Sequence, residues 1–282
     1  MELTREHYNH LIEQALAEDL GKGDVTTDAL IPEDERGSAT IRAKSDGLLA
    51  GIEVARQVFL KVDPELKVTV LIQDGTALKT GDAIARVEGR IASILKAERT
   101  ALNFLQHLSG IATETARYVE AVKGLPARVV DTRKTIPGLR MLEKYAVLMG
   151  GGRNHRIRLD DGILIKDNHL KTLRRRGLGM KEIIAQARAR NTAGLKIEVE
   201  VKSVEEALEA ADAGADIIML DNMSIDDMRK AVKLLKSRCL FEASGGVNLD
   251  TVRAIAETGI DIISVGALTH SSRALDINMK LD

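Results

Sequence analysis

The stretch Ala211-Asp212-Ala213-Gly214-Ala215-Asp216-Ile217-Ile218 ends a helical pattern with glycine and then enters an apolar run. A second copy of this pattern follows as Ala256-Glu257-Thr258-Gly259-Ile260-Asp261-Ile262-Ile263. Glycine commonly ends helices, and a short apolar run after it is typical of a buried strand. The two copies therefore predict repeated units of strand and helix, from which parallel barrels are built.

The same alternation extends from about residue 128 to residue 265. Helices are predicted at about 138–150, 179–191, 203–213, 225–237 and 249–258. Strands are predicted at Arg128–Asp131, Gly162–Lys166, Lys196–Val201, Asp216–Asp221, Cys239–Ala243 and Asp261–Val265. Such alternation requires parallel strands joined by crossover helices. Because only about six strands are visible instead of eight, the pattern favours an incomplete TIM-like (β/α) barrel.

The part of the chain before residue 128 has a different character. Residues 37–90 contain short β-rich runs separated by turn pairs such as Asp74-Gly75, with one helix near 52–62. They predict a small antiparallel sheet. Helices are predicted over residues 4–19 and 91–123, and Gly110 is a candidate break in the second.

Composition excludes several classes of protein. The 282 residues include 41 basic and 42 acidic side chains, and the net charge of -1 provides no global field for nucleic acid or a membrane surface. Aromatic residues make up 2%, too few for base stacking. No signal peptide or apolar run of ~18 residues is visible. The single cysteine, Cys239, lies in an apolar run and fits a buried thiol in a reducing compartment. These features predict a cytoplasmic protein.

Cationic side chains gather where the predicted strands end. Arg133 and Lys134 follow the first strand, His155 and Arg156 precede the second, and Lys166 ends it. Loops at the carboxyl ends of barrel strands converge on one mouth. Solvated surface charge is the simpler explanation for any one of them. As a group they predict a pocket for a ligand with several carboxylates or phosphates.

Carboxylates are predicted at the same mouth. Glu198 and Glu200 are two residues apart and face the same side of a strand, while Asp221 ends the next strand. Glu200 and Asp221 could hold Mg²⁺, directly or through water, or bind ribose hydroxyls. The alternative is an internal pair with Lys196 or Lys202, which we favour for Glu198.

Two glycine runs are candidates for binding phosphate. Ser244-Gly245-Gly246 follows a strand, Asn248-Leu249-Asp250 opens the next helix, and Gly266-Ala267-Leu268 follows the last strand. Backbone N–H groups at such positions bind phosphate, and late barrel strands often form this kind of site. Tight turns alone are the alternative. His107, His169 and His270 have no spacing that indicates zinc.

Many short segments, in order, resemble those of quinolinate phosphoribosyltransferases. They include Glu18-Asp19-Leu20-Gly21, Glu98-Arg99-Thr100-Ala101-Leu102-Asn103, Asp131-Thr132-Arg133-Lys134-Thr135, Gly151-Gly152, Asn154-His155-Arg156, Ile163-Leu164-Ile165-Lys166-Asp167-Asn168-His169, Glu198-Val199-Glu200-Val201, Leu220-Asp221-Asn222 and Glu242-x-Ser244-Gly245-Gly246. The resemblance covers nearly the whole chain.

The resemblance implies a fold and a reaction. The fold would be α/β, with an N-terminal open-faced α/β sandwich over residues 1–115 and a barrel over residues 116–267. The last segment, about 268–282, is a candidate to pack on the sandwich. The reaction would join quinolinate to 5-phosphoribosyl-1-pyrophosphate (PRPP), with Mg²⁺, giving nicotinate mononucleotide, pyrophosphate and CO₂. The protein would be a homodimer, or a dimer of dimers or hexamer, in which Arg99 completes the partner's active site.

The resemblance also implies roles for the residues singled out above. Lys134, Lys166, Glu200 and Asp221 would be catalytic, and Glu200 and Asp221 would hold the metal. The substrate-binding set would be Arg99, Arg133, Lys134, His155, Arg156, Lys166, Glu200, Asp221, Ser244, Gly245, Gly246, Gly266, Ala267 and Leu268.

Three other functions remain open from the sequence. One is a Schiff-base aldolase that uses Lys166. Another is a related transferase that acts on nicotinate or a molybdenum-linked acid. The third is a protein that binds or senses small anions without turnover.

Overall fold

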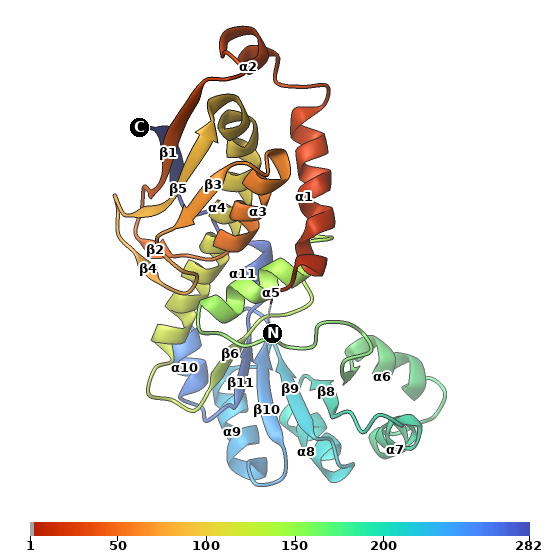
Figure 1. Ribbon diagram of the computed structural model, residues 1–282. Coiled ribbons are helices and arrows are strands. Elements are labelled where there is room, and N and C mark those ends of the chain that lie inside the picture. The colour runs from red at the N-terminus through yellow and green to blue at the C-terminus, as the bar shows by residue number, and fades with distance from the viewer. Residues whose placement is uncertain (1–2) are drawn as a thin grey trace. The chain divides into compact units, whose positions relative to one another are not determined.

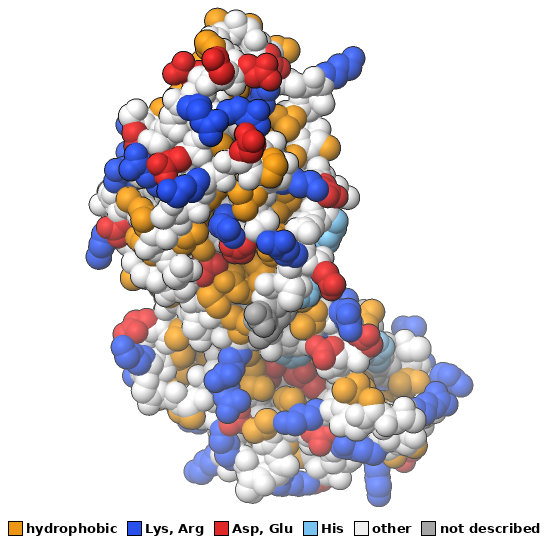
Figure 2. Space-filling view, viewed as in Figure 1, with side chains coloured by type: hydrophobic (Ala, Val, Ile, Leu, Met, Phe, Trp, Pro, Cys, Tyr) orange, Lys and Arg blue, Asp and Glu red, His pale blue; other side chains and the backbone are white. Residues whose placement is uncertain are grey.

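The computed structural model describes residues 3–282, which form two compact units (Figure 1). The first unit comprises Met1–Ala116, Thr135–Gly151 and Leu268–Asp282. The second comprises Arg117–Lys134 and Gly152–Ala267. No helix in the described residues is long and apolar enough to cross a membrane. Basic and acidic side chains are interspersed over the face shown in Figure 2, as the near-zero net charge implies.

The first unit is built on an antiparallel sheet in the order β12-β1-β5-β3. A two-stranded sheet pairs β2 with β4. The elements are α1 (Arg5–Leu20), α2 (Val25–Leu30), β1 (Arg36–Ala43), β2 (Gly47–Leu48), α3 (Ile52–Val62), β3 (Lys67–Val70), β4 (Ala77–Leu78), β5 (Ala83–Arg90), α4 (Ile91–Ala121), α5 (Arg140–Met149), α11 (Ala267–His270) and β12 (Ile277–Leu281). The antiparallel sheet and the helix at 52–62 are confirmed.

Gly110 does not break helix α4, which runs unbroken from Ile91 to Ala121. A Cβ at position 110 would lie 2.1 Å from the backbone oxygen of Arg273. The C-terminal segment therefore approaches the helix too closely for any side chain. The prediction of a break was wrong because glycine here serves packing between two segments far apart in sequence.

Residues 135–151 are grouped with the first unit, although the predicted boundary placed them with the barrel. Two side-chain contacts of α5 explain the difference. The phenol of Tyr145 donates to the Asp74 carboxylate at 2.7 Å, and Glu143 lies 2.9 Å from the His107 imidazole. Both partners belong to the first unit, so the chain leaves the barrel after its first strand and later returns to it.

The second unit contains one sheet of six parallel strands in the order β6-β11-β10-β9-β8-β7. The strands are β6 (Arg128–Val130), β7 (Ile163–Ile165), β8 (Ile197–Val201), β9 (Ile217–Asp221), β10 (Leu240–Ser244) and β11 (Ile262–Ser264), and Figure 1 shows neighbouring strands of this sheet side by side. All six predicted strands are confirmed. In this sheet β6 and β7 are the two edges, so the barrel is open between them.

Helices connect the parallel strands. They are α6 (Asp167–Arg174), α7 (Met180–Arg190), α8 (Val204–Asp212), α9 (Ile225–Leu235) and α10 (Val252–Ala256). Helix α6 was not predicted. Apolar and acidic side chains alternate along β8. Val199 and Val201 are fully buried, while Glu198 and Glu200 both line cavities. The expected shared side of the two glutamates is thus confirmed.

Candidate active site

The open seam of the barrel is bordered by an irregular segment, residues 152–158. Arg153 forms a parallel bridge with Val130 of β6, and its backbone N–H donates to the Val129 carbonyl at 2.9 Å. The fully buried Asp131 accepts two further hydrogen bonds from this segment, from Asn154 Nδ2 at 2.6 Å and from the backbone N–H of His155 at 2.9 Å. The segment therefore continues the sheet beyond β6 and places residues 155 and 156 at the mouth.

A cavity of ≈ 330 Å³ lies at the carboxyl ends of the strands. It contains most of the side chains that sequence reasoning assigned to a polyanion site. Its lining residues are Thr132, Arg133, Lys134, His155, Arg156, Leu164, Lys166, Glu200, Met219, Asp221, Glu242, Ser244 and Ser264. Four cationic side chains and the carboxylates of Glu200 and Asp221 thus share one space.

Two of these cations are close enough to repel each other. Burial, followed by the charge of the nearby Arg133, lowers the pKa of Arg156. One arm of the Arg156 guanidinium, Nη1, donates to the Gly162 carbonyl at 3.0 Å. Like charges held together in this way are stabilised by an anion between them. The arrangement therefore suits a ligand with more than one negative charge.

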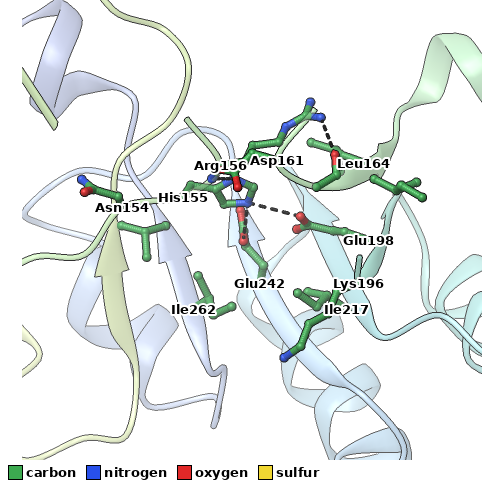
Figure 3. A pocket seen from close by; sticks show the side chains of 13 residues that line it. Asn154, His155, Arg156, Asp161, Leu164, Lys196, Glu198, Ile217, Glu242 and Ile262 are labelled. Carbon is green, nitrogen blue, oxygen red and sulfur yellow. Dashed lines mark hydrogen bonds and ion pairs between the residues drawn. The ribbon is translucent and has the colours of Figure 1, made fainter. Parts of the chain in front are cut away.

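His155, which lines this cavity, lies between two buried glutamates, as the view of a neighbouring cavity in Figure 3 shows. Its Nε2 is 3.2 Å from Glu198 Oε2 on β8 and 3.2 Å from Glu242 Oε2 on β10. Its Nδ1 accepts the backbone N–H of Arg156 at 2.8 Å. The same three side chains border a second cavity of ≈ 280 Å³. His155 thus separates two cavities within the barrel.

The three side chains share protons. Burial disfavours a charged imidazole, but hydrogen bonds to Glu198 and Glu242 outweigh burial and raise the pKa of His155 above its usual value. Burial, together with the neighbouring Glu242, raises the pKa of Glu198 to about 7. An imidazolium carries a proton on Nδ1 and could not accept the N–H of Arg156 there. The hydrogen bond to Nδ1 therefore holds the ring in the form whose one proton lies on Nε2, facing the carboxylates.

Imidazole and two carboxylates could also hold a divalent metal, since their ligand atoms lie within 4.8 Å of one another. An imidazole that binds a metal through Nε2 carries its proton on Nδ1. Here Nδ1 faces the N–H of Arg156. Proton sharing therefore fits this cluster better than a metal.

The two glycine runs stay a prediction as phosphate sites. The side chain of Asn248 accepts the N–H groups of Asp250 and Thr251, so these two donors have a partner within the chain. Leu268 is fully buried within α11, a helix of only four residues, so its backbone and not its side chain is the candidate contact. Ser244 lines the site cavity, whereas Gly245, Gly246, Gly266 and Ala267 are not among its lining residues.

Local packing explains why residue 245 is a glycine. Its φ is +89°, and an added Cβ would lie 2.4 Å from Asn222 Oδ1. Asn222 itself has a positive φ of 52° and donates from Nδ2 to Asp221 Oδ1 at 2.9 Å. The glycine thus allows the loops after β9 and β10 to pack closely beside Asp221.

The proposed pairing of Glu198 with Lys196 or Lys202 is wrong. Glu198 faces His155, and Lys202 instead binds Asp167 at 2.8 Å. The remaining histidines also have local partners. Nδ1 of His169 accepts the backbone N–H of Lys166 at 2.9 Å, at the start of helix α6. Cys239 is half-buried, and burial raises the pKa of its thiol, as expected for a structural cysteine.

Sequence reasoning missed Glu242 and Asp131 as parts of the site. Glu242 is a single acid within the apolar strand Leu240–Ser244, and Asp131 ends the apolar strand β6. A lone acid in a buried strand is a usable signal, because burial of an unpaired carboxylate is costly.

Comparison with known proteins agrees with this geometry. The family model for the N-terminal domain of quinolinate phosphoribosyl transferase matches residues 24–109, and that for the C-terminal domain matches residues 111–280. This chain belongs to the quinolinate phosphoribosyltransferase family. A mitochondrial quinolinate phosphoribosyltransferase [decarboxylating] from Nicotiana tabacum is 43% identical over 95% of this chain and 80% of its own length. A probable nicotinate-nucleotide pyrophosphorylase from Bacillus subtilis is 42% identical over 95% of this chain and 91% of its own length.

Solved structures support the fold of this family. NadC from Streptococcus pyogenes is 43% identical, with a TM-score of 0.94 over 99% of this chain and 98% of that protein. The nicotinate-nucleotide pyrophosphorylase from Francisella tularensis is 37% identical, also with a TM-score of 0.94, over 100% and 98%. The predicted fold class, a sandwich with an incomplete barrel, is confirmed. A cytoplasmic location stays a prediction, since the tobacco relative is named as mitochondrial.

Proposed function

We propose that this chain transfers the phosphoribosyl group of PRPP to quinolinate and removes one carboxylate. The products are nicotinate mononucleotide, pyrophosphate and CO₂. The observation that carries the proposal is the cavity that Arg133, Lys134, Arg156 and Lys166 line together with Glu200 and Asp221. One side of the site suits a dianion, and the other suits a ribose that becomes positive during transfer. The names of the relatives point to the same reaction.

The cationic side chains of the cavity would bind quinolinate. Arg133 lies near enough to lower the pKa of Arg156, and each guanidinium can bind a carboxylate with two parallel hydrogen bonds. Lys134 and Lys166, both exposed at the rim, would supply point charges to the second carboxylate or to pyrophosphate. In this proposal the cations would turn the ring nitrogen toward the ribose, and no protein nucleophile is required.

Ribosyl transfer creates positive charge on the sugar as pyrophosphate leaves. Glu200 on β8 and Asp221 on β9 line the same cavity and would stabilise that charge electrostatically. Ser244, and the loop through Gly246, would contact a phosphate group of PRPP, with Gly266 and Ala267 as further candidates. Leu268 would contribute only its backbone, because its side chain is buried.

Mg²⁺ fits the donor set on the acidic side of the cavity. Magnesium prefers carboxylate oxygens and retained waters, which Glu200 and Asp221 could offer at adjacent strand ends. When bound, the ion would neutralise the pyrophosphate group. Asp221 is held for this role by Asn222, which donates to its Oδ1.

Decarboxylation requires that an electron pair be accepted when CO₂ leaves. Once the ring nitrogen carries ribose, its positive charge stabilises the pair left on the adjacent ring carbon, which then takes up a proton from solvent in place of CO₂. The protein then has to hold the carboxylate in place and exclude competing orientations. Arg133 and Arg156 are the groups that would do so.

The decisive experiment mixes purified protein with quinolinate, PRPP and Mg²⁺ and measures nicotinate mononucleotide by chromatography and CO₂ release. We expect both products in equal amounts, with no product when any component is omitted. Nicotinate in place of quinolinate tests the related transferase, and borohydride trapping tests the aldolase. Product from nicotinate but not from quinolinate would reject the proposed substrate.

A shared active site is the second part of the proposal. Arg99 is exposed on α4, and we propose that it reaches the substrate of a partner subunit in a homodimer. Arg99→Ala and Lys166→Ala should each retain only a small part of the activity alone, with kcat/KM lowered by about a hundredfold. Mixed subunits of the two variants should regain part of the activity, because one of the two sites in a mixed dimer has both residues intact. No recovery after verified subunit exchange would contradict the shared site.

A further inference from the structure

We propose that Glu198 and Glu242 are positioning residues that orient His155 and thereby fix the backbone from which Arg156 reaches the substrate cavity. The inference rests on the proposed function for its kinetic test but has an independent spectroscopic one. Neither glutamate belongs to the set of groups proposed to bind quinolinate or PRPP.

Mechanical support for Arg156 comes from two parts of the barrel. Arg156 projects from residues 152–158, which are neither helix nor regular strand. The beginning of this segment is held by β6, through Val130 and Asp131. Farther along, the imidazole of His155 enters the barrel and meets β8 and β10 (Figure 3). The His155 side chain therefore anchors the segment to strands beyond the seam.

The imidazole of His155 is also fixed in direction. The ring uses Nε2 for the glutamates and Nδ1 for the backbone N–H of Arg156 at 2.8 Å. Both nitrogens are thus committed, which leaves one ring orientation. A rotation of the ring would break the contact with the Arg156 backbone. The glutamate contacts at Nε2 thus fix the ring, and the ring in turn fixes the backbone of Arg156.

Burial of the two glutamates is energetically costly. Glu242 is fully buried and Glu198 is 5% exposed, and Glu198 Oε1 and both Glu242 carboxylate oxygens lack a hydrogen bond of good geometry in residues 3–282. Buried carboxylates reduce stability, and an apolar pair of similar volume often costs less. Their negative charge also opposes the binding of a dianion. A role in global stability or in direct substrate attraction therefore does not explain them, whereas orientation of an imidazole does.

A double-mutant cycle tests this coupling. Glu242→Gln keeps the shape of the side chain and removes its charge, and His155→Asn removes the ring. Each single variant should raise KM for quinolinate and lower kcat/KM by about tenfold to a hundredfold, with KM for PRPP nearly unchanged. The double variant should be no worse than the more impaired single variant, because Glu242 acts through His155. Glu209→Gln, an exposed glutamate on α8, is the matched control and should behave as the unaltered protein.

Two outcomes overturn the inference. Losses that multiply in the double variant would show that Glu242 acts independently of His155. An unchanged KM for quinolinate in a folded Glu242→Gln protein would show that positioning is not needed. Glu198→Gln provides the same test if Glu242→Gln does not fold.

A measurement without substrate separates this inference from the proposed reaction. Nitrogen-15 NMR of the imidazole should show Nε2 protonated and Nδ1 unprotonated in the unaltered protein, with a larger share of the other tautomer in Glu242→Gln. If the protein makes no nicotinate mononucleotide but this change occurs, the reaction assignment fails and the positioning stands. If the tautomer of His155 is the same in both proteins, the positioning fails whatever the reaction.

Discussion

Asp131 joins two consecutive residues of the segment at the barrel seam, because its Oδ2 accepts Asn154 Nδ2 at 2.6 Å while its Oδ1 accepts the backbone N–H of His155 at 2.9 Å. Both carboxylate oxygens of this fully buried side chain are therefore used to hold the loop that leads to Arg156. Asp131 thus supports the site although it does not line the cavity.

Asp131→Asn should disrupt this support. An asparagine retains one acceptor for His155, but its amide would face the Asn154 amide, donor against donor. We expect the free energy of unfolding to fall by about 1–3 kcal/mol and kcat/KM for quinolinate to fall with it. Denaturant titration and initial rates measure both. The exchanged pair Asp131→Asn with Asn154→Asp restores one donor and one acceptor and should recover much of the stability; no recovery would mean that another feature of Asp131 matters.

The cationic cavity gives a second prediction. Arg133→Ala and Lys166→Ala should each lower kcat/KM for quinolinate by about a hundredfold, because each removes a charge that stabilises an anionic substrate or leaving group. Lys181→Ala, an exposed cation on α7 outside the cavity lining, is the control and should have no effect. Steady-state kinetics over both substrates measure the change, and near-normal rates in the two cavity variants would remove them from the site.

The strands and the cavity were predictable from sequence for a physical reason. Apolar runs such as Ile217–Asp221 and glycine helix ends are local signals, and the parallel arrangement follows from alternation. The carboxyl ends of parallel barrel strands converge, which is why the sequence alone was enough to place Lys166, Glu200 and Asp221 together.

Features that depend on distant partners were not predictable in this way. The family resemblance made the last segment a candidate to pack on the sandwich, but no residue near Met279 or Ile41 indicates the register that places them opposite each other. Glu242 was read as part of an apolar strand because its partner, His155, is far away in the chain. The same limitation made Gly110 resemble a helix break, since the segment that requires it begins at Arg273.

Gly110→Ala gives a third prediction. The added Cβ would lie 2.1 Å from the Arg273 backbone oxygen and 3.0 Å from Ala274 Cα, so the C-terminal segment has to move. Alanine favours helix, but overpacking should dominate and lower the free energy of unfolding by about 1–3 kcal/mol. Gly162→Ala, where the nearest atom is 3.7 Å away, is the control for stability. An unaltered or higher melting temperature in Gly110→Ala would contradict the close approach.

Acid stability gives a last prediction, from the first unit. A hydrogen bond from Arg90 Nε, at 2.8 Å, lowers the pKa of Asp63 from 3.8 to about 2. A lowered pKa means that the folded state favours the carboxylate, so the stabilisation is complete above about pH 4 and is lost as pH falls toward 2.

Asp63→Asn should therefore lower the free energy of unfolding at pH 7. The loss should be on the order of 1 kcal/mol, because the Arg90 side chain is partly exposed. The difference in free energy of unfolding from the unaltered protein should shrink as pH falls from 4 to 2. Denaturant titrations at several pH values measure it. Asp212→Asn, at an exposed site on α8, serves as the control because its side chain is 70% exposed. A difference that is equally large at pH 7 and at pH 2 would show that Asp63 acts through shape or hydrogen bonding and not through its charge.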